Sequence, residues 1–190
     1  MFAISQAAKL VKCGFITIDA ETRTIRQILA VERNPKTVAR HLVGSANPVP
    51  GSEPDELITL HLLLDATAQQ PSGTASSPTG IYPLLSALEL LLYVPTGRPN
   101  SIPWIIFVWG GRRILPVRLT EMQIIEESFD SALNPVRAEI TVTLKVLKDA
   151  DLAPGSYGRS LWDVHLQLLQ TLAATAPAAT LADLGLAGTP

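Results

Sequence analysis

The segment that decides the fold is VRAEITVTLKVL, residues 136–147, in which apolar and polar side chains alternate almost without a break. Successive side chains of a β-strand point to opposite faces, so this segment predicts a strand with one face in a core. The expected buried face carries Ala138, Ile140, Val142, Leu144 and Val146, and the opposite face carries Arg137, Glu139, Thr141, Thr143 and Lys145.

Further strands are predicted at residues 10–29 (two short strands around a polar turn), 37–43, 57–65, 104–109 and 112–127. In the segment 57–65, the side chains of Leu60, Leu62 and Leu64 share one face, which we expect to be buried. Between the last two strands, Gly110-Gly111 predicts a tight hairpin turn with a positive φ at both glycines. The first part of the chain is therefore expected to be rich in β-structure.

Two helices are predicted from apolar residues that recur three and four positions apart. The first covers residues 81–94 and is closed by Pro95; the second covers 160–174, after a hinge at 153–156. The second helix carries a stripe formed by Leu161, Val164, Leu168 and Leu172. Loops are expected at 46–56 and at 66–79, the latter charge-free and mobile. We therefore expect a β domain at residues 1–150 and a C-terminal helical extension at residues 151–190.

Composition excludes several classes of protein. The chain has 190 residues, enough for one domain with its own core, and its charged share of 17% and net charge of −2 argue against a nucleic-acid partner. An apolar share of 47% with few charges is typical of proteins that cover apolar surface with partners. No apolar run approaches the roughly 20 residues of a membrane span, and no secretory signal is found.

No motif for catalysis or cofactor binding emerges from the sequence. Gly110-Gly111 lacks the lysine and hydroxyl residue of a phosphate-binding loop, and the single cysteine, Cys13, excludes a disulfide within the chain. His41, His61 and His165 do not have the spacing of metal ligands. We therefore expect a protein that is not an enzyme and that holds no metal or cofactor.

Three short segments within residues 98–148 indicate a family when they are taken together: Ile102-Pro103, FVWG at 107–110, and NPVRAEITVTLK at 134–145. In this order they resemble the tube-like domain of a baseplate protein of contractile injection systems, which are phage-tail-like particles. Weaker similarities follow the same order at Asn34-Pro35, 60–67 and 81–95, so the resemblance spans residues 8–148. That family commonly continues into a LysM-like module. GRSLWD at 158–163 resembles the start of such a module, but the rest of its pattern is absent, so we expect a helical remnant.

The resemblance implies a fold and a structural role. The implied fold is α+β and mainly β: a tail-tube-like antiparallel β-barrel or sandwich with one packed helix, plus the C-terminal helical extension. The implied role is a six-fold ring that links the inner tube and spike hub to the baseplate wedges. The expected partners are the inner tube protein, the spike or hub protein, the baseplate wedge proteins and further copies of the chain. Assembly is expected in the bacterial cytoplasm, as part of a phage-tail-like particle.

A set of residues is proposed for contacts in such a ring, each with packing or solvation within the chain as the alternative. Trp104 and Trp109 are either interface anchors or core side chains. The other candidates are three arginines after the glycine pair, one arginine on the strand 136–147 and two residues of the last helix: Arg112, Arg113, Arg118, Arg137, Trp162 and Leu168. Other functions stay open: a tube-adaptor or cap component at the opposite end of the particle, an enzyme with an unseen site, or a peptidoglycan-binding protein.

Overall fold

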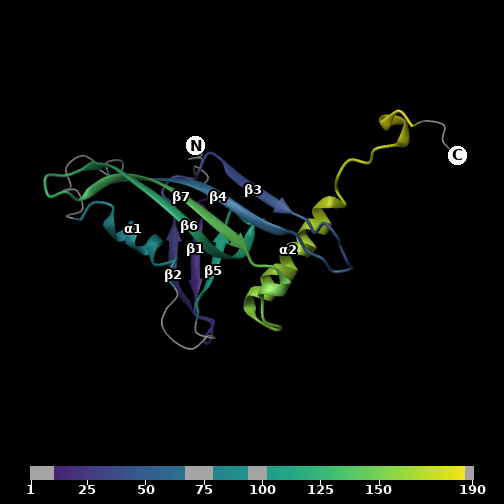
Figure 1. Ribbon diagram of the computed structural model, residues 1–190, viewed down its shortest axis with the longest axis horizontal. Helices are drawn as coiled ribbons and strands as arrows, with labels where there is room; N and C mark the ends of the chain where they lie inside the picture. Colours follow the sequence, from purple (N-terminus) through teal and green to yellow (C-terminus); the bar gives the residue numbers. More distant parts are fainter. Residues whose placement is uncertain (1–10, 67–78, 94–101, 187–190) are drawn as a thin grey trace, which may run out of the picture.

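The computed structural model describes residues 11–66, 79–93 and 102–186 and shows a mainly β protein with a C-terminal helix, as predicted (Figure 1). All strand pairs are antiparallel and form one seven-stranded sheet in the order β2-β1-β5-β6-β7-β4-β3. The strands are β1 (Gly14–Ile18), β2 (Ile25–Ala30), β3 (Val38–Val43), β4 (Asp55–Asp65), β5 (Trp104–Val108), β6 (Ile114–Phe129) and β7 (Pro135–Val146). The segment expected to be mobile, 66–79, lies almost entirely outside the described residues.

The long strand β6 joins two halves of the sheet that run in different directions. Its first residues pair with β5 and the remainder pairs with β7, with Val117 in both ladders. In Figure 1, β1, β2 and β5 run across the direction of β4 and β7. Register shifts after Leu119 and Glu126 act as bulges that bend the strand. The expected barrel or sandwich is thus a single bent sheet with β2 and β3 at its ends, and no further strand among the described residues pairs with either.

The core lies on one face of β4 and β7. The predicted alternation is confirmed in both strands: Ile58 and Leu60 in β4, and Val142 and Leu144 in β7, are fully buried. These side chains form one cluster with Phe15 and other residues from the second half of the sheet. Because burial of each large aliphatic side chain contributes about 2 kcal/mol, this face fixes the register of every strand it includes.

Helix α1 (Tyr82–Glu89) is shorter than the helix predicted at 81–94. Leu85 and Leu88 are buried in the core, and Leu91 continues the same apolar stripe. Beyond Glu89, however, the amides of Leu91 and Leu92 donate to carbonyls only three residues back. The chain therefore tightens into successive turns, and its buried apolar residues continue beyond the end of the regular helix.

The turn between β5 and β6 also differs from its prediction. Only Gly110 has a positive φ, and the amide of Trp109 donates to the carbonyl of Arg113 at 2.8 Å. The turn thus has three residues between these two positions, rather than two glycines with mirror-image geometry. One glycine supplies the left-handed conformation, and Gly111 adopts an ordinary one.

Helix α2 (Tyr157–Ala173) begins earlier than predicted because Ser156 is its N-cap, accepting a hydrogen bond from the amide of Arg159 at 3.3 Å. Its buried residues are Gly158, Trp162 and His165, one on each successive turn. The predicted stripe at Leu161, Val164, Leu168 and Leu172 therefore does not form the contact with the sheet. Val164 is 61% exposed and Leu172 is 39% exposed.

The side chain of Asn34, in the turn at Asn34-Pro35, makes two hydrogen bonds to the backbone near the start of β1. Its Oδ1 accepts from the amide of Cys13 and its Nδ2 donates to the carbonyl of Val11, both at 2.8 Å. The side chain thereby ties the chain that enters β1 to the segment that leaves β2.

Replacing Asn34 by alanine is expected to lower the free energy of unfolding by about 2 kcal/mol, because both backbone groups lose a partner. Urea denaturation at neutral pH measures this change. Asn34→Asp is the matched control, since it keeps an acceptor for Cys13 but no donor for Val11, and we expect about half the loss. Equal midpoints for all three proteins would show that this side chain does not support β1.

Candidate assembly surfaces

Helix α2 is attached to the sheet domain through Glu53, which lies in the loop before β4. The indole Nε1 of Trp162 donates to Glu53 Oε1 at 2.8 Å, and Glu53 Oε2 accepts from the amide of Asp149 at 2.9 Å. An ion pair between Arg159 and Asp149 at 2.6 Å adds a second tie between the helix and the short 3-10 helix that follows β7. Trp162, a candidate for partner contacts, is thus buried against its own chain.

Both tryptophans of β5 and its turn are half-buried and pack against their own chain. A Cβ at Gly158 would lie 3.0 Å from Cζ3 of Trp104, so the half-buried Trp104 ring lies directly against the backbone of α2. The ring of Trp109 lies 6.3 Å from the buried ring of Phe107. Trp104 and Trp109 thus pack against their own chain while each ring keeps some exposed area, so their role as interface anchors stays a prediction.

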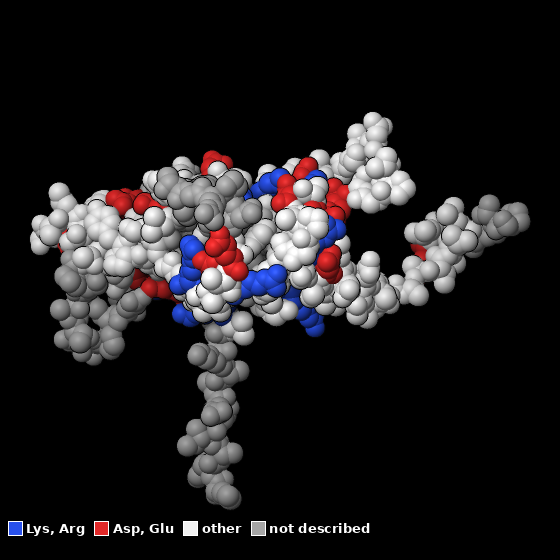
Figure 2. All heavy atoms as spheres, turned by 90° about the horizontal axis from the view of Figure 1, so that it is seen from below, with Lys and Arg blue, Asp and Glu red and all other residues white. Residues whose placement is uncertain are grey.

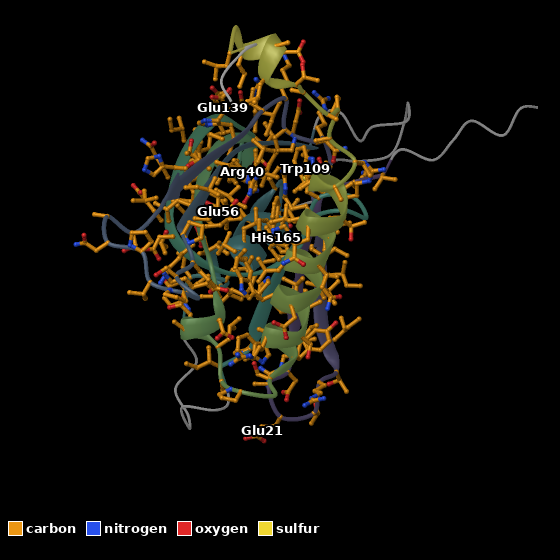
Figure 3. The ribbon with its side chains drawn as sticks, turned by 90° about the vertical axis from the view of Figure 1, so that its right-hand side faces the viewer. Glu21, Arg40, Glu56, Trp109, Glu139 and His165 are labelled. Atoms are coloured by element: carbon orange, nitrogen blue, oxygen red, sulfur yellow. The ribbon has the colours of Figure 1, made fainter. Side chains whose placement is uncertain are left out.

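A group of charged and titratable side chains surrounds the buried Glu56 and His165, between the sheet and α2. Nε of Arg40 in β3 donates to Oε1 of Glu56 in β4 at 2.5 Å, and the Glu56 side chain is only 5% exposed. Arg113 and His165 complete the group, and Figure 3 shows Arg40, Glu56 and His165 close together. Nδ1 of His165 is buried and has no hydrogen-bond partner among the described residues. We refer to these four residues as the charged cluster.

The charges of this cluster act on the protonation of His165. Burial lowers the pKa of His165 from its usual value near 6.5; Glu56 opposes that shift, and Arg40 and Arg113 add to it. Burial likewise lowers the pKa of Arg113, whereas the hydrogen bond to Glu56 raises the pKa of Arg40. The site therefore disfavours the charged form of His165 on the buried side of α2, and Glu56 is the counter-charge for the two arginines.

The structure does not bring the three candidate arginines together. Arg113 belongs to the charged cluster, whereas Arg112 is exposed and lines a surface depression of about 490 Å³ beside Trp109. Arg118 is exposed, lies opposite Lys145 in the β6–β7 ladder and lines a separate cavity of about 110 Å³. These side chains do not form one basic patch.

The remaining candidates have clear places. Nε of Arg137 in β7 donates to Oε2 of Glu127 in β6 at 2.7 Å, which is a cross-strand ion pair on an open surface. Leu168 is half-buried on α2, between the turns that carry Val164 and Leu172.

Sequence reasoning missed Glu53, Glu56 and the role of His165. Both glutamates fall in the segment expected to be a loop, but β4 begins at Asp55. A signal was available for Glu56, because it lies two residues before Ile58 and so continues the buried face of β4. No signal existed for Glu53, whose partner Trp162 is distant in the sequence.

The two end strands of the sheet present apolar side chains to solvent. In β2, Ile25 and Ile28 are exposed, and in β3, Leu42 and Val43 are exposed. Neither strand contains lysine, proline or an acidic residue. The arginine of each strand is paired inside the chain, Arg26 with Asp19 and Arg40 with Glu56. Both ends therefore lack the lysines and prolines that commonly block pairing between sheet edges.

Metal and membrane sites are not found in the part of the chain that the structure describes. No three histidine, cysteine or acidic side chains of residues 11–66, 79–93 and 102–186 are grouped as metal ligands. None of the helices there combines the length and apolar character needed to cross a membrane. Cys13 is buried, and burial raises the pKa of its thiol.

Comparison with known proteins identifies one matching family. A family model described as "Contractile injection system tube protein" matches residues 19–153, more than half of the 190 residues. The match includes strands β2 to β7 and ends before α2 begins at Tyr157. A search of curated proteins finds no match. The antiparallel sheet and the extent of the match lead to one conclusion: the chain belongs to the contractile injection system tube protein family.

Proposed function

We propose that this structural component of a contractile injection system forms a six-fold ring that links the inner tube and spike hub to the baseplate wedges. Proteins of its family are structural and not enzymes, and they assemble with other tube or particle components. The baseplate position and the six-fold copy number rest on the resemblance of residues 98–148 to a baseplate protein. In this proposal, residues 1–150 are the tube-like domain and residues 151–190 are an extension for further contacts.

The observation that carries the ring is the presence of two different open edges on one sheet. A ring needs two complementary surfaces on each chain, because every contact joins one surface to a different one on the next copy. Strands β2 and β3 lie at opposite ends of the sheet order and differ in sequence. Pairing β2 of one copy with β3 of the next would supply backbone hydrogen bonds and cover apolar side chains on both strands.

The charge of the two edges supports this pairing. Because Arg26 and Arg40 are each neutralised by a carboxylate of their own chain, an approaching strand meets no unpaired arginine on either edge. Interface cores are depleted in charge and enriched in apolar area, as these edges are.

The function is tested by imaging particles from cells that lack this protein, next to cells in which it is restored. We expect the tubes to lose their baseplate and spike, and restoration to return both. Overlong tubes with normal baseplates would overturn the proposal in favour of a cap component at the opposite end. Tight binding of the purified chain to peptidoglycan would instead favour a glycan-binding role for the extension.

A further inference from the structure

The segment that follows α2 extends away from the body of the molecule and carries leucines that touch little of it. We call residues 175–186 the C-terminal arm. Leu181, Leu184 and Leu186 are 60%, 69% and 52% exposed, respectively. Figure 1 shows the arm beyond the end of α2, and in Figure 2 it projects from the body of the molecule. The only charged residue of the arm is Asp183. Three leucines on a projecting segment are costly to leave in water.

The arm is nevertheless locally ordered by its own hydrogen bonds. Asp183 Oδ2 accepts from the amide and the hydroxyl of Thr180, at 2.7 and 2.8 Å, which caps the 3-10 turn Leu181–Leu184. Gly185 closes the turn with φ +71, and the amide of Leu186 donates to the carbonyl of Leu181 at 2.9 Å. The leucines are thus held on one short capped turn, which lowers the entropy cost of binding.

The chain also has an apolar surface on α2 that its described part covers only partly. We call Leu161, Val164, Leu168 and Leu172 the outer face of α2; two of these residues are exposed and two are half-buried. The arm does not fold back on this face, as the exposure of its leucines shows. Pro177 favours an extended conformation at Ala176, so the chain leaves α2 without reversing.

We infer that the C-terminal arm of one copy docks its leucines on the outer face of α2 of the next copy in the ring. This inference rests on the proposed function, because a ring repeats one and the same contact between every pair of neighbouring copies. A head-to-tail exchange covers every arm and every outer face with none left over.

Charge favours a second copy over a charged partner. From Ser160 to Leu186 the charged side chains are only Asp163 and Asp183, and His165 is buried. Such a surface offers nothing to a nucleic acid or to an anionic membrane, and it suits apolar contact with an equally uncharged surface. Three leucines are too few to hold two chains together alone, so the arm reinforces a ring that the sheet edges form.

The inference is tested by disulfide trapping in the assembled fraction of the full chain. Val164→Cys and Leu184→Cys are made in separate proteins, mixed, assembled and oxidised. Cys13 is a poor competitor because it is buried and burial raises its pKa. We expect disulfide-linked dimers between the two variants. The matched control pairs Leu184→Cys with Leu133→Cys, an exposed leucine at the tip of the β6–β7 hairpin, and should give at least tenfold fewer dimers.

Each outcome decides a different question. Rings that form without the 164–184 disulfide overturn the arm contact and leave the ring intact. A protein carrying both cysteines that gives only intramolecular disulfides shows that the arm folds back on its own helix, which also overturns the inference. A chain that never assembles, with or without cysteines, counts against the proposed function itself.

A second measurement does not depend on cysteine chemistry. Replacing Leu181, Leu184 and Leu186 by alanine is expected to raise the protein concentration at which the ring dissociates at least tenfold. The urea midpoint of the single chain should stay unchanged, because these side chains are exposed there. An unchanged dissociation concentration overturns the inference.

Discussion

Replacing Ile28 in β2 by lysine is expected to abolish ring assembly while the chain itself stays folded. Ile28 is 63% exposed, so the substitution should change the free energy of unfolding by less than about 0.5 kcal/mol. In the ring, the same side chain would carry an ammonium group into an apolar strand pair, where an unpaired charge costs several kcal/mol. Light scattering after gel filtration, with urea denaturation alongside, measures both effects.

The same design tests whether the two edges meet each other. Leu42→Lys on β3 should also give monomers, whereas Val49→Lys, at an exposed valine in the loop between β3 and β4, should assemble normally. A mixture of the Ile28 and Leu42 variants retains one intact β2 edge and one intact β3 edge. We therefore expect it to form a one-to-one dimer that cannot grow. Rings in either single variant would show that these edges are not the contact.

The strands that build the core are predictable because their pattern is strong and local. In β7, five apolar residues alternate with polar ones, and only one placement buries the whole set. In β4, the leucines likewise alternate with other residues, and one placement of the strand buries them on the same face. Burial follows from period alone here, since one face of each strand is much more apolar than the other.

The contact face of α2 could not be predicted in this way, because two of its faces are apolar. Leu161, Val164 and Leu168 have helical spacing, but so do Gly158, Trp162 and His165. What selects the second face is a hydrogen bond from Trp162 to Glu53 and the close fit of Gly158 against Trp104. Glu53 and Trp104 are both distant from α2 in the sequence, so a local sequence pattern cannot predict these contacts.

The candidate arginines lie apart in the fold for a related reason. Arg112 and Arg113 are adjacent, yet one is exposed beside Trp109 and the other lies near Glu56. Neighbouring side chains leave an extended chain in opposite directions, so proximity in sequence does not imply a shared surface. The charged cluster forms instead from β3, β4, the β5–β6 turn and α2, which only the folded chain brings together.

That cluster gives the largest expected effect on stability. Glu56→Gln should lower the free energy of unfolding by about 3 kcal/mol, because Arg40 and Arg113 then lie beside the buried position 56 without a counter-charge. The value is at the low end for a broken buried pair because the Arg40 side chain remains 29% exposed. Glu139→Gln is the matched control: its carboxylate is exposed and lies 4.0 Å from Arg137, so the expected loss is below about 0.5 kcal/mol.

The dependence of this loss on pH identifies its electrostatic origin. The pKa of His165 is lowered in the folded chain, so the unfolded chain binds more protons as the pH falls through 6.5, and acid reduces stability. Glu56 opposes that lowering, and its removal should lower the pKa of His165 further. The urea midpoint of Glu56→Gln should therefore fall more steeply than that of the wild type between pH 7.5 and 5.5. Parallel pH profiles would show that the variant acts through packing alone. Recovery of stability in a double replacement, Arg40→Met with Glu56→Leu, would show that the loss in Glu56→Gln comes from the unpaired charge of Arg40, because Arg113 is kept in both proteins.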